Sequence, residues 1–248
     1  MASVEPASEN TAEAPPPEGG ILRHRLATRL WHWLNALAVF IMIGSGLMIS
    51  NAHPHLYWGQ YGANFDHVWF NPPHFPGWMT IPSTYNLAFG RRWHLLFALI
   101  LAFNLLIFMI VSLANRHFAR AYRFRSSELG PRHLWADIRD HLALRFRDPE
   151  RPAEYNTLQK IAYVVAIFVL IPLMILTGLT LSPAMDAAWP WLLDLFGGRA
   201  SARSIHFLTC WAIIGFIFIH LALVLLAGPA EEIGAMITGR IRPSEGGE

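Results

Sequence analysis

Four long apolar segments constrain this chain more than any other feature of its sequence. They cover approximately residues 29–50, 92–114, 159–181 and 204–227. A helix needs roughly 20 mostly apolar residues to cross a hydrocarbon core about 30 Å thick, and each segment reaches that length. Of the 248 residues, 54% are hydrophobic and only 15% are charged, which is unlike a soluble domain of this size. The sequence therefore predicts an all-α membrane protein, a four-transmembrane-helix bundle.

The arginines indicate how the bundle is oriented. Residues 51–90, between the first two spans, contain no Lys or Arg. The connection between the second and third spans holds nine arginines: Arg116, Arg120, Arg123, Arg125, Arg132, Arg139, Arg145, Arg147 and Arg151. Basic loops stay on the cytoplasmic side. We therefore expect a multi-pass protein of the bacterial cytoplasmic (inner) membrane with both termini in the cytoplasm. The net charge of +2 follows from this topology and gives no sign of nucleic-acid binding.

The segments outside the spans differ in character. Residues 1–20 are acidic and rich in proline, which predicts a disordered cytoplasmic tail before a single membrane domain, 21–240. The long outer loop, 51–90, is rich in aromatic residues and turn signals, so we expect it to be ordered. Its aromatic side chains suit either the docking of a partner or the bilayer interface. In the arginine-rich connection, apolar residues at helical spacing predict an amphipathic interfacial helix: Leu134, Ile138, Leu142 and Phe146.

Two histidines in the fourth span are separated by 14 residues of almost entirely apolar sequence. At about 100° and 1.5 Å per residue, His206 and His220 point to one face at depths about 21 Å apart. Polar residues in membrane helices usually face the bundle interior with a partner or a function. Matching depths across the bundle pairs His206 with His94 near the outer surface and His220 with His32 in the inner half. Such pairs can ligate two stacked haems.

Several other residues are candidates for lesser roles at these sites. Arginines near the four histidines can pair with haem propionates: Arg29, Arg91, Arg92 and Arg203. His24 rivals His32 as a ligand, but it lies about 12 Å too close to the cytoplasm to match His220. Cys210 is interpreted as a packed apolar thiol. The outer-loop histidines lack consistent metal spacing and are interpreted as solvated or hydrogen-bonded: His53, His55, His67 and His74.

These motifs resemble the four-helix di-haem cytochrome b family of formate dehydrogenase gamma subunits, hydrogenase cytochrome b subunits and bacterial cytochrome b561. The resemblance covers roughly residues 21–240 and is carried by WHW at 31–33, WH at 93–94 and the histidine pair of the fourth span. It implies two haem b groups and electron transport. A haem iron held by two histidines is six-coordinate and has no open position for oxygen, which suits electron transfer.

The resemblance also extends to the start of the third span. YNTLQK at 155–160 resembles the YNAGQK stretch of the gamma subunits and differs at Thr157 and Leu158. In that family this region helps to form a quinone site, which implies Asn156 and Gln159 as quinone-binding candidates. Together with LTGLTLSPAM and the long outer loop, it is most similar to subunits that accompany periplasmic molybdopterin oxidoreductases. The implied role is the electron-transfer subunit of an oxidoreductase complex.

Two other classes of function remain open from the sequence. In the first, the protein is a self-contained haem enzyme that oxidises superoxide or another small reductant and reduces quinone, with a cationic outer rim attracting the anion. In the second, it is a haem-free membrane anchor, and its four ligand histidines are dispensable. The chain has no molybdopterin, iron–sulfur or flavin motif of its own, so chemistry on a soluble substrate falls to a partner.

Overall fold

The computed structural model describes residues 21–62, 66–118, 122–125, 128–143 and 156–241. The predicted tail, 1–20, and Phe146 of the predicted interfacial helix lie outside these residues. The elements are β1 (Ile21–Leu22), α1 (Leu26–Ala52), the 3-10 turn η1 (Gly77–Met79), α2 (Leu87–Ala114), α4 (Pro131–Leu142), α5 (Thr157–Val165), the π-helical turn η2 (Ala166–Leu170), α6 (Ile171–Thr180), α7 (Pro183–Ala188), α8 (Trp191–Leu195), α9 (Arg199–Ala227), α10 (Pro229–Thr238) and β2 (Arg240–Ile241).

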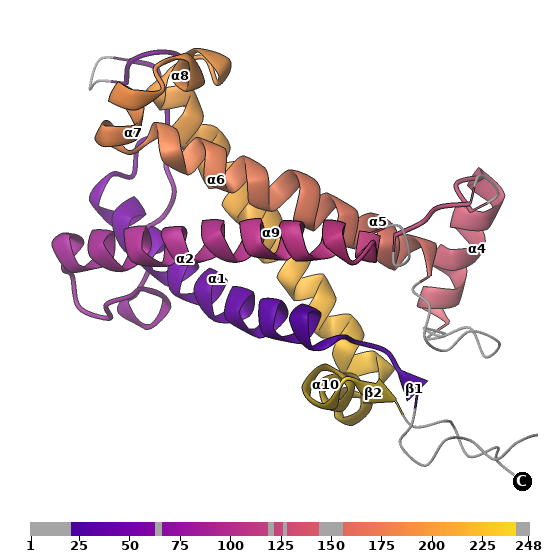
Figure 1. Ribbon diagram of the computed structural model, residues 1–248. Helices are drawn as coiled ribbons and strands as arrows, with labels where there is room; N and C mark the ends of the chain where they lie inside the picture. Colours follow the sequence, from indigo (N-terminus) through magenta and orange to yellow (C-terminus); the bar gives the residue numbers. More distant parts are fainter. Residues whose placement is uncertain (1–20, 63–65, 119–121, 126–127, 144–155, 242–248) are drawn as a thin grey trace, which may run out of the picture.

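The four predicted spans are confirmed as four long apolar helices (Figure 1). They are α1, α2, the continuous helix α5–η2–α6 and α9. Polar caps fix two of their starts, because a side-chain oxygen satisfies an N–H group of the first turn that has no helical partner. Asn86 Oδ1 accepts from Phe89 N–H and starts α2 five residues before the predicted boundary. The chain is an all-α integral membrane protein.

The third span changes its hydrogen bonding beside Pro172. Directly before α6, Ile171 N–H donates to Ala166 O, five residues back, which makes one π-helical turn. Proline has no N–H to donate to the turn before it. The regular α-helical ladder is therefore interrupted directly before Pro172.

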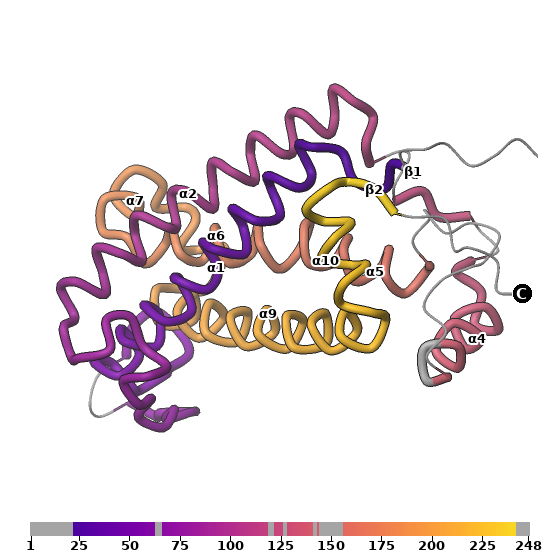
Figure 2. Tube along the Cα trace, turned by 90° about the horizontal axis from the view of Figure 1, so that it is seen from below, coloured from indigo at the N-terminus to yellow at the C-terminus, as the bar shows by residue number. Residues whose placement is uncertain are grey.

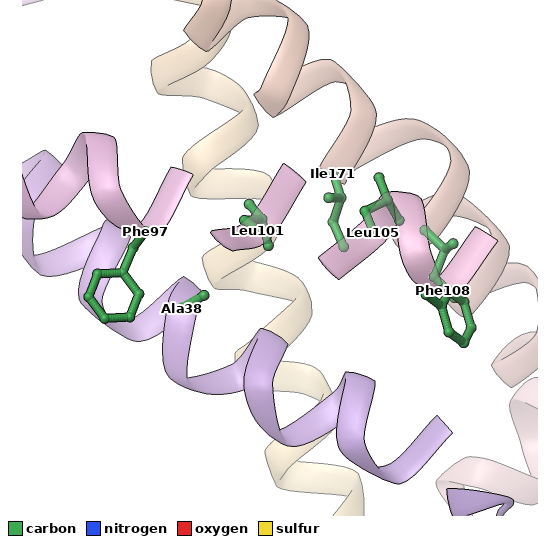
Figure 3. Close-up of a cluster of buried hydrophobic side chains, with 7 residues drawn as sticks. Ala38, Phe97, Leu101, Leu105, Phe108 and Ile171 are labelled. Atoms are coloured by element: carbon green, nitrogen blue, oxygen red, sulfur yellow. The ribbon is translucent and has the colours of Figure 1, made fainter. Parts of the chain in front are cut away.

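The bundle core joins three of the four spans and leaves most of α9 aside. Helix α1 runs along α2, and α6 runs along α9 (Figure 2). The core cluster contains residues of α1, α2 and the third span (Figure 3): Ala38, Phe97, Leu101, Leu105, Phe108, Ile167 and Ile171. The buried residues of α9 all lie between Ser201 and Thr209. The rest of α9, which carries His220, is not covered by protein to the same degree.

The described part of the outer loop folds back onto the start of α9. Asn51 exchanges two hydrogen bonds of 2.8 Å with the backbone of Phe75. Trp69 Nε1 donates to Ser204 Oγ at 2.9 Å, and Ser204 Oγ donates to the Tyr57 carbonyl at 2.6 Å. These bonds fix the end of the bundle that carries the loop, which we call the outer end.

The opposite, inner end brings both ends of the described chain together. Strands β1 and β2 pair antiparallel, with Ile21 opposite Ile241. Helix α10 follows α9 at this end, and its Met236 carbonyl accepts from Trp33 Nε1 at 3.2 Å. The predicted interfacial helix is present as α4, whose Asp137 Oδ2 accepts from Thr157 N–H at the start of α5. The amino- and carboxy-terminal segments are thus on the same side.

A buried histidine at the inner end predicts loss of stability in acid. Burial, and then the charge of Arg23, lower the pKa of His24 to about 4, against about 6.5 when unfolded. The unfolded chain binds the extra proton first, so this contribution is complete above pH 6.5 and is lost as the pH falls toward 4. Between pH 7 and pH 5 we expect a loss of about 2 kcal/mol.

Thermal unfolding of the detergent-purified protein at pH 7 and pH 5 measures this loss. The variant His24→Gln has no ionisable group at this position, so its melting temperatures at the two pH values should differ less than those of the wild type. Equal pH dependence in the two proteins contradicts the role of His24.

Candidate haem sites

The structure brings together both histidine pairs that the sequence proposes. At the inner end, the imidazoles of His32 on α1 and His220 on α9 have centroids 6.3 Å apart and planes at 60°. At the outer end, those of His94 on α2 and His206 on α9 have centroids 6.2 Å apart and planes at 68°. Helix α9 therefore supplies one member of each pair.

The spacing within each pair matches two imidazoles on one metal. A bond from a first-row metal to an imidazole nitrogen is about 2.0 Å, and the ring centre lies about 1.1 Å beyond that nitrogen, so opposed ligands have centroids about 6.2 Å apart. Two imidazole rings that stack directly on each other lie closer together and leave no room for a metal ion between them. The two pairs fit bis-histidine ligation of a haem iron at two depths.

Hydroxyl groups hold the two outer imidazoles from the neighbouring helices. Ser45 Oγ on α1 lies 3.1 Å from His94 Nδ1, and Thr177 Oγ1 on α6 lies 2.9 Å from His206 Nδ1. Each hydroxyl donates its own proton at 2.7 Å to a backbone carbonyl four residues earlier, Ser45 to Ile41 and Thr177 to Leu173. Its oxygen is then left to accept from Nδ1–H. In neutral histidine this leaves Nε2 without a proton, as a metal ligand requires.

A glycine follows each of these hydroxyl residues and makes room for the imidazole. A Cβ atom placed on Gly46 lies 3.4 Å from His94 Cε1, and one placed on Gly178 lies 3.3 Å from His206 Cε1. Both distances are at the short limit of ordinary carbon contacts. A Ser-Gly pair on α1 and a Thr-Gly pair on α6 thus hold the two outer histidines in the same way.

The inner site is held differently and has buried polar atoms without a partner. Among the described residues, His32 Nδ1, Trp31 Nε1 and Asn35 Oδ1 are buried and make no hydrogen bond. His220 stacks on Phe216, with ring centroids 5.9 Å apart, and meets the Tyr163 ring edge-on at 6.4 Å. Buried polar groups are normally hydrogen-bonded. The unpartnered Nδ1 of His32, which belongs to the inner pair, therefore fits a site that holds a further group.

The four arginine candidates differ in their surroundings. At the outer end, Arg91 Nη2 donates to His53 Nε2 at 3.2 Å, and Arg203 donates to the His53 carbonyl. Burial, and then the charges of Arg203 and Arg91, lower the pKa of His53. At the inner end, Arg29 Nε donates to the Met236 carbonyl at 3.4 Å. Arg92 is exposed near the start of α2.

Two guanidinium groups therefore converge on His53, near the outer histidine pair. The interpretation of His53 as a hydrogen-bonded loop residue agrees with these contacts. An anion placed near Arg91 and Arg203 meets positive charge from both.

The quinone candidates lie at the inner start of the third span. Asn156 Oδ1 accepts from Gln159 N–H at 2.9 Å and caps α5. The next residue, Lys160, is buried and donates to Glu128 Oε2 at 3.1 Å. Burial alone raises the pKa of Glu128, but the hydrogen bond and charge of Lys160 lower it overall. This ion pair holds the turn before α4 against the third span.

Sequence reasoning missed the two residues that hold the outer imidazoles, Ser45 and Thr177. The available signal was a hydroxyl residue followed by glycine in two apolar spans, as GSG at 44–46 and LTG at 176–178. Either stretch alone is common in membrane helices, because small residues allow close packing. Only the structure shows that each of them faces a histidine. Cys210, four residues after His206, is a free and partly buried thiol.

Comparison with known proteins identifies a family over nearly the whole described chain. Residues 23–239 match the family described as prokaryotic cytochrome b561. A relative from Azospira oryzae, named as the protein-methionine-sulfoxide reductase subunit YedZ1, is 30% identical over 211 residues, which cover 85% of this chain and 93% of the relative.

More distant relatives bear another name. A Ni/Fe-hydrogenase B-type cytochrome subunit from Cupriavidus necator is 25% identical over 224 residues, covering 85% of this chain and 82% of the relative. One of the same name from Rhodobacter capsulatus is 25% identical over 203 residues, covering 78% and 69%. No solved structure matches the chain.

Proposed function

Since this chain belongs to the prokaryotic cytochrome b561 family, we propose that it carries electrons across the membrane between a partner on the outer face and the quinone pool near the inner face. One observation carries the proposal. Two pairs of imidazoles lie at iron-ligand spacing, His94 with His206 and His32 with His220. Because the two α9 members are 14 residues apart, the sites are about 21 Å apart along the helix.

The chain's own residues determine where the sites lie and what they exclude. When bound, two b-type haems supply one-electron redox centres at two depths. If both histidines of a pair held the iron, no ligand position would be left for oxygen or another small molecule, which would suit electron transfer rather than oxygenation. Apolar side chains of α2 and the third span surround the bundle interior and keep water away from the space between the sites.

The arginine candidates are assigned to the carboxylates of the haems. Arg91 and Arg203, which converge on His53, are suited to bind an outer propionate, since guanidinium groups pair with carboxylates through several N–H groups. Exposed Arg92 extends the positive charge along the same rim. Arg29 has the corresponding position at the inner end, beside α10.

A periplasmic oxidoreductase subunit, of the molybdopterin type, is the proposed electron-exchange partner. The folded outer loop exposes large aromatic side chains, with Tyr61 85% and Trp78 83% exposed, which suit a docking surface. Relatives are named as subunits of a methionine-sulfoxide reductase and of hydrogenases. With the arginine-rich connection inside, the described termini lie in the cytoplasm and the protein spans the bacterial inner membrane.

A dithionite-reduced minus oxidised spectrum, with haem measured per polypeptide, tests the proposal. We expect about two b-type haems per chain. Purified protein without a Soret band, from cells that supply haem, overturns the proposal and favours a haem-free anchor. A stable complex with a soluble oxidoreductase supports the proposed partner over a self-contained enzyme.

The quinone assignment has its own variant. In Gln159→Leu, the side chain keeps its size but loses its amide, so reoxidation of the reduced protein by a short-chain quinone should slow by roughly tenfold, as when one hydrogen bond is lost. Haem content should not change. The unchanged haem content is the control for the fold of the Gln159→Leu variant. Unchanged reoxidation in Gln159→Leu excludes this residue from the quinone site.

A further inference from the structure

The two outer histidines share an arrangement that the proposed function does not require. Each donates Nδ1–H to a hydroxyl on the preceding span, and each hydroxyl donates to a carbonyl of its own helix. In such a chain, each hydrogen bond polarises the next.

At the inner site, His32 lacks this arrangement. His32 Nδ1 is buried and without a hydrogen-bond partner among the described residues. A ligand histidine that donates its second N–H becomes a stronger base toward the metal. A stronger basic ligand stabilises the oxidised iron more than the reduced iron, and second-shell hydrogen bonding is one of the means by which a protein sets a haem potential. The two sites therefore differ in a property that affects electron flow.

We propose that Ser45 and Thr177 are positioning residues that fix the Nδ1–H tautomer of His94 and His206 and lower the reduction potential of the outer haem. The proposal rests on the two-haem function above. A lower potential at the outer site directs electrons toward the inner end, since electrons move to the site of higher potential. The hydroxyls act through the imidazoles and touch neither iron nor substrate.

A redox titration of single-haem protein tests the proposal. In a His220→Ala background, only the outer haem remains, so its midpoint potential is measured without overlap. Ser45→Ala and Thr177→Val each remove one acceptor, and both should shift the outer midpoint to more positive potential, with a larger shift when combined. Thr177→Ser retains the hydroxyl and should restore the original potential.

A matched control separates the hydrogen bond from general repacking. Thr209 on α9 makes the same bond to the carbonyl four residues earlier, Ile205, at 2.8 Å, and its described hydrogen bonds include none to an imidazole. Thr209→Val should leave the outer midpoint unchanged. In a His206→Ala background, which keeps only the inner haem, Ser45→Ala and Thr177→Val should also leave the midpoint unchanged.

The outcomes distinguish this inference from the function on which it rests. Fewer than two haems in the wild type contradict the proposed function before any variant is made. Two haems together with an unshifted outer midpoint in Ser45→Ala and Thr177→Val overturn the present inference alone. If Ser45→Ala loses the outer haem, Ser45→Cys, whose thiol is a weaker acceptor, must retain it with a raised midpoint. An unshifted midpoint there also overturns the inference.

Discussion

Replacing His206 with alanine should reduce the haem content from about two to about one per chain, because a single imidazole is left to hold the outer haem. His94→Ala should lose the same haem, since the two rings lie at the spacing of one shared metal, 6.2 Å. Combining these two substitutions should remove no more than either one alone. Combining His206→Ala with His32→Ala takes one ligand from each pair and should remove both haems.

Haem per polypeptide and the reduced-minus-oxidised spectrum of each variant give the measurement. His24→Ala is the control, because His24 is buried at the inner end near His32 but belongs to neither pair. It should retain both haems. Additive losses of haem for His94→Ala and His206→Ala, or loss of haem in His24→Ala, contradict the proposed pairing of the histidines.

Replacing His220 with alanine should stop electron transfer across the membrane while the outer haem remains reducible. The inner pair lies about 21 Å from the outer pair by helix rise, and without it no redox centre remains in the inner half. Protein in liposomes that contain ferricyanide, with dithionite added outside, measures the transfer directly. We expect the rate for His220→Ala to fall to that of empty liposomes, and the rate for His32→Ala to fall equally.

Protein in either orientation must pass electrons through both sites, so mixed insertion does not affect this comparison. His55→Ala, in the outer loop, should transfer electrons at the wild-type rate. If His220→Ala transfers at the wild-type rate, the inner site does not lie on the path. Neither the partner nor the quinone takes part in this measurement, so its outcome concerns the chain alone.

The fold could be predicted because the membrane restricts the possible structures. Backbone groups in lipid must be paired within the segment, so an apolar stretch of sufficient length is a helix. The sequence therefore placed all four spans to within about five residues. Helix starts were less predictable. They depend on single caps such as Asn86, which look like ordinary polar residues in a sequence.

The histidine pairing could also be proposed from sequence, since depth in a membrane follows from helix rise. The residues that hydrogen-bond these histidines could not be proposed from the sequence. Ser45 and Thr177 meet their histidines only through the packing of α1 on α2 and of α6 on α9. The relation of Arg91 and Arg203 to His53 likewise depends on how the outer loop leaves α1. These contacts join distant parts of the chain and follow no sequence period.

The position of α9 has a consequence for biogenesis. Both pairs take one member from α9, the last of the four spans to leave the ribosome, and the other from α1 or α2. The histidines of the first two spans therefore enter the bilayer as incomplete sites. In the proposed ligation, both haem sites are completed only when α9 joins the bundle. Under that ligation, a nascent chain that stops before α9 has one histidine at each site and completes neither.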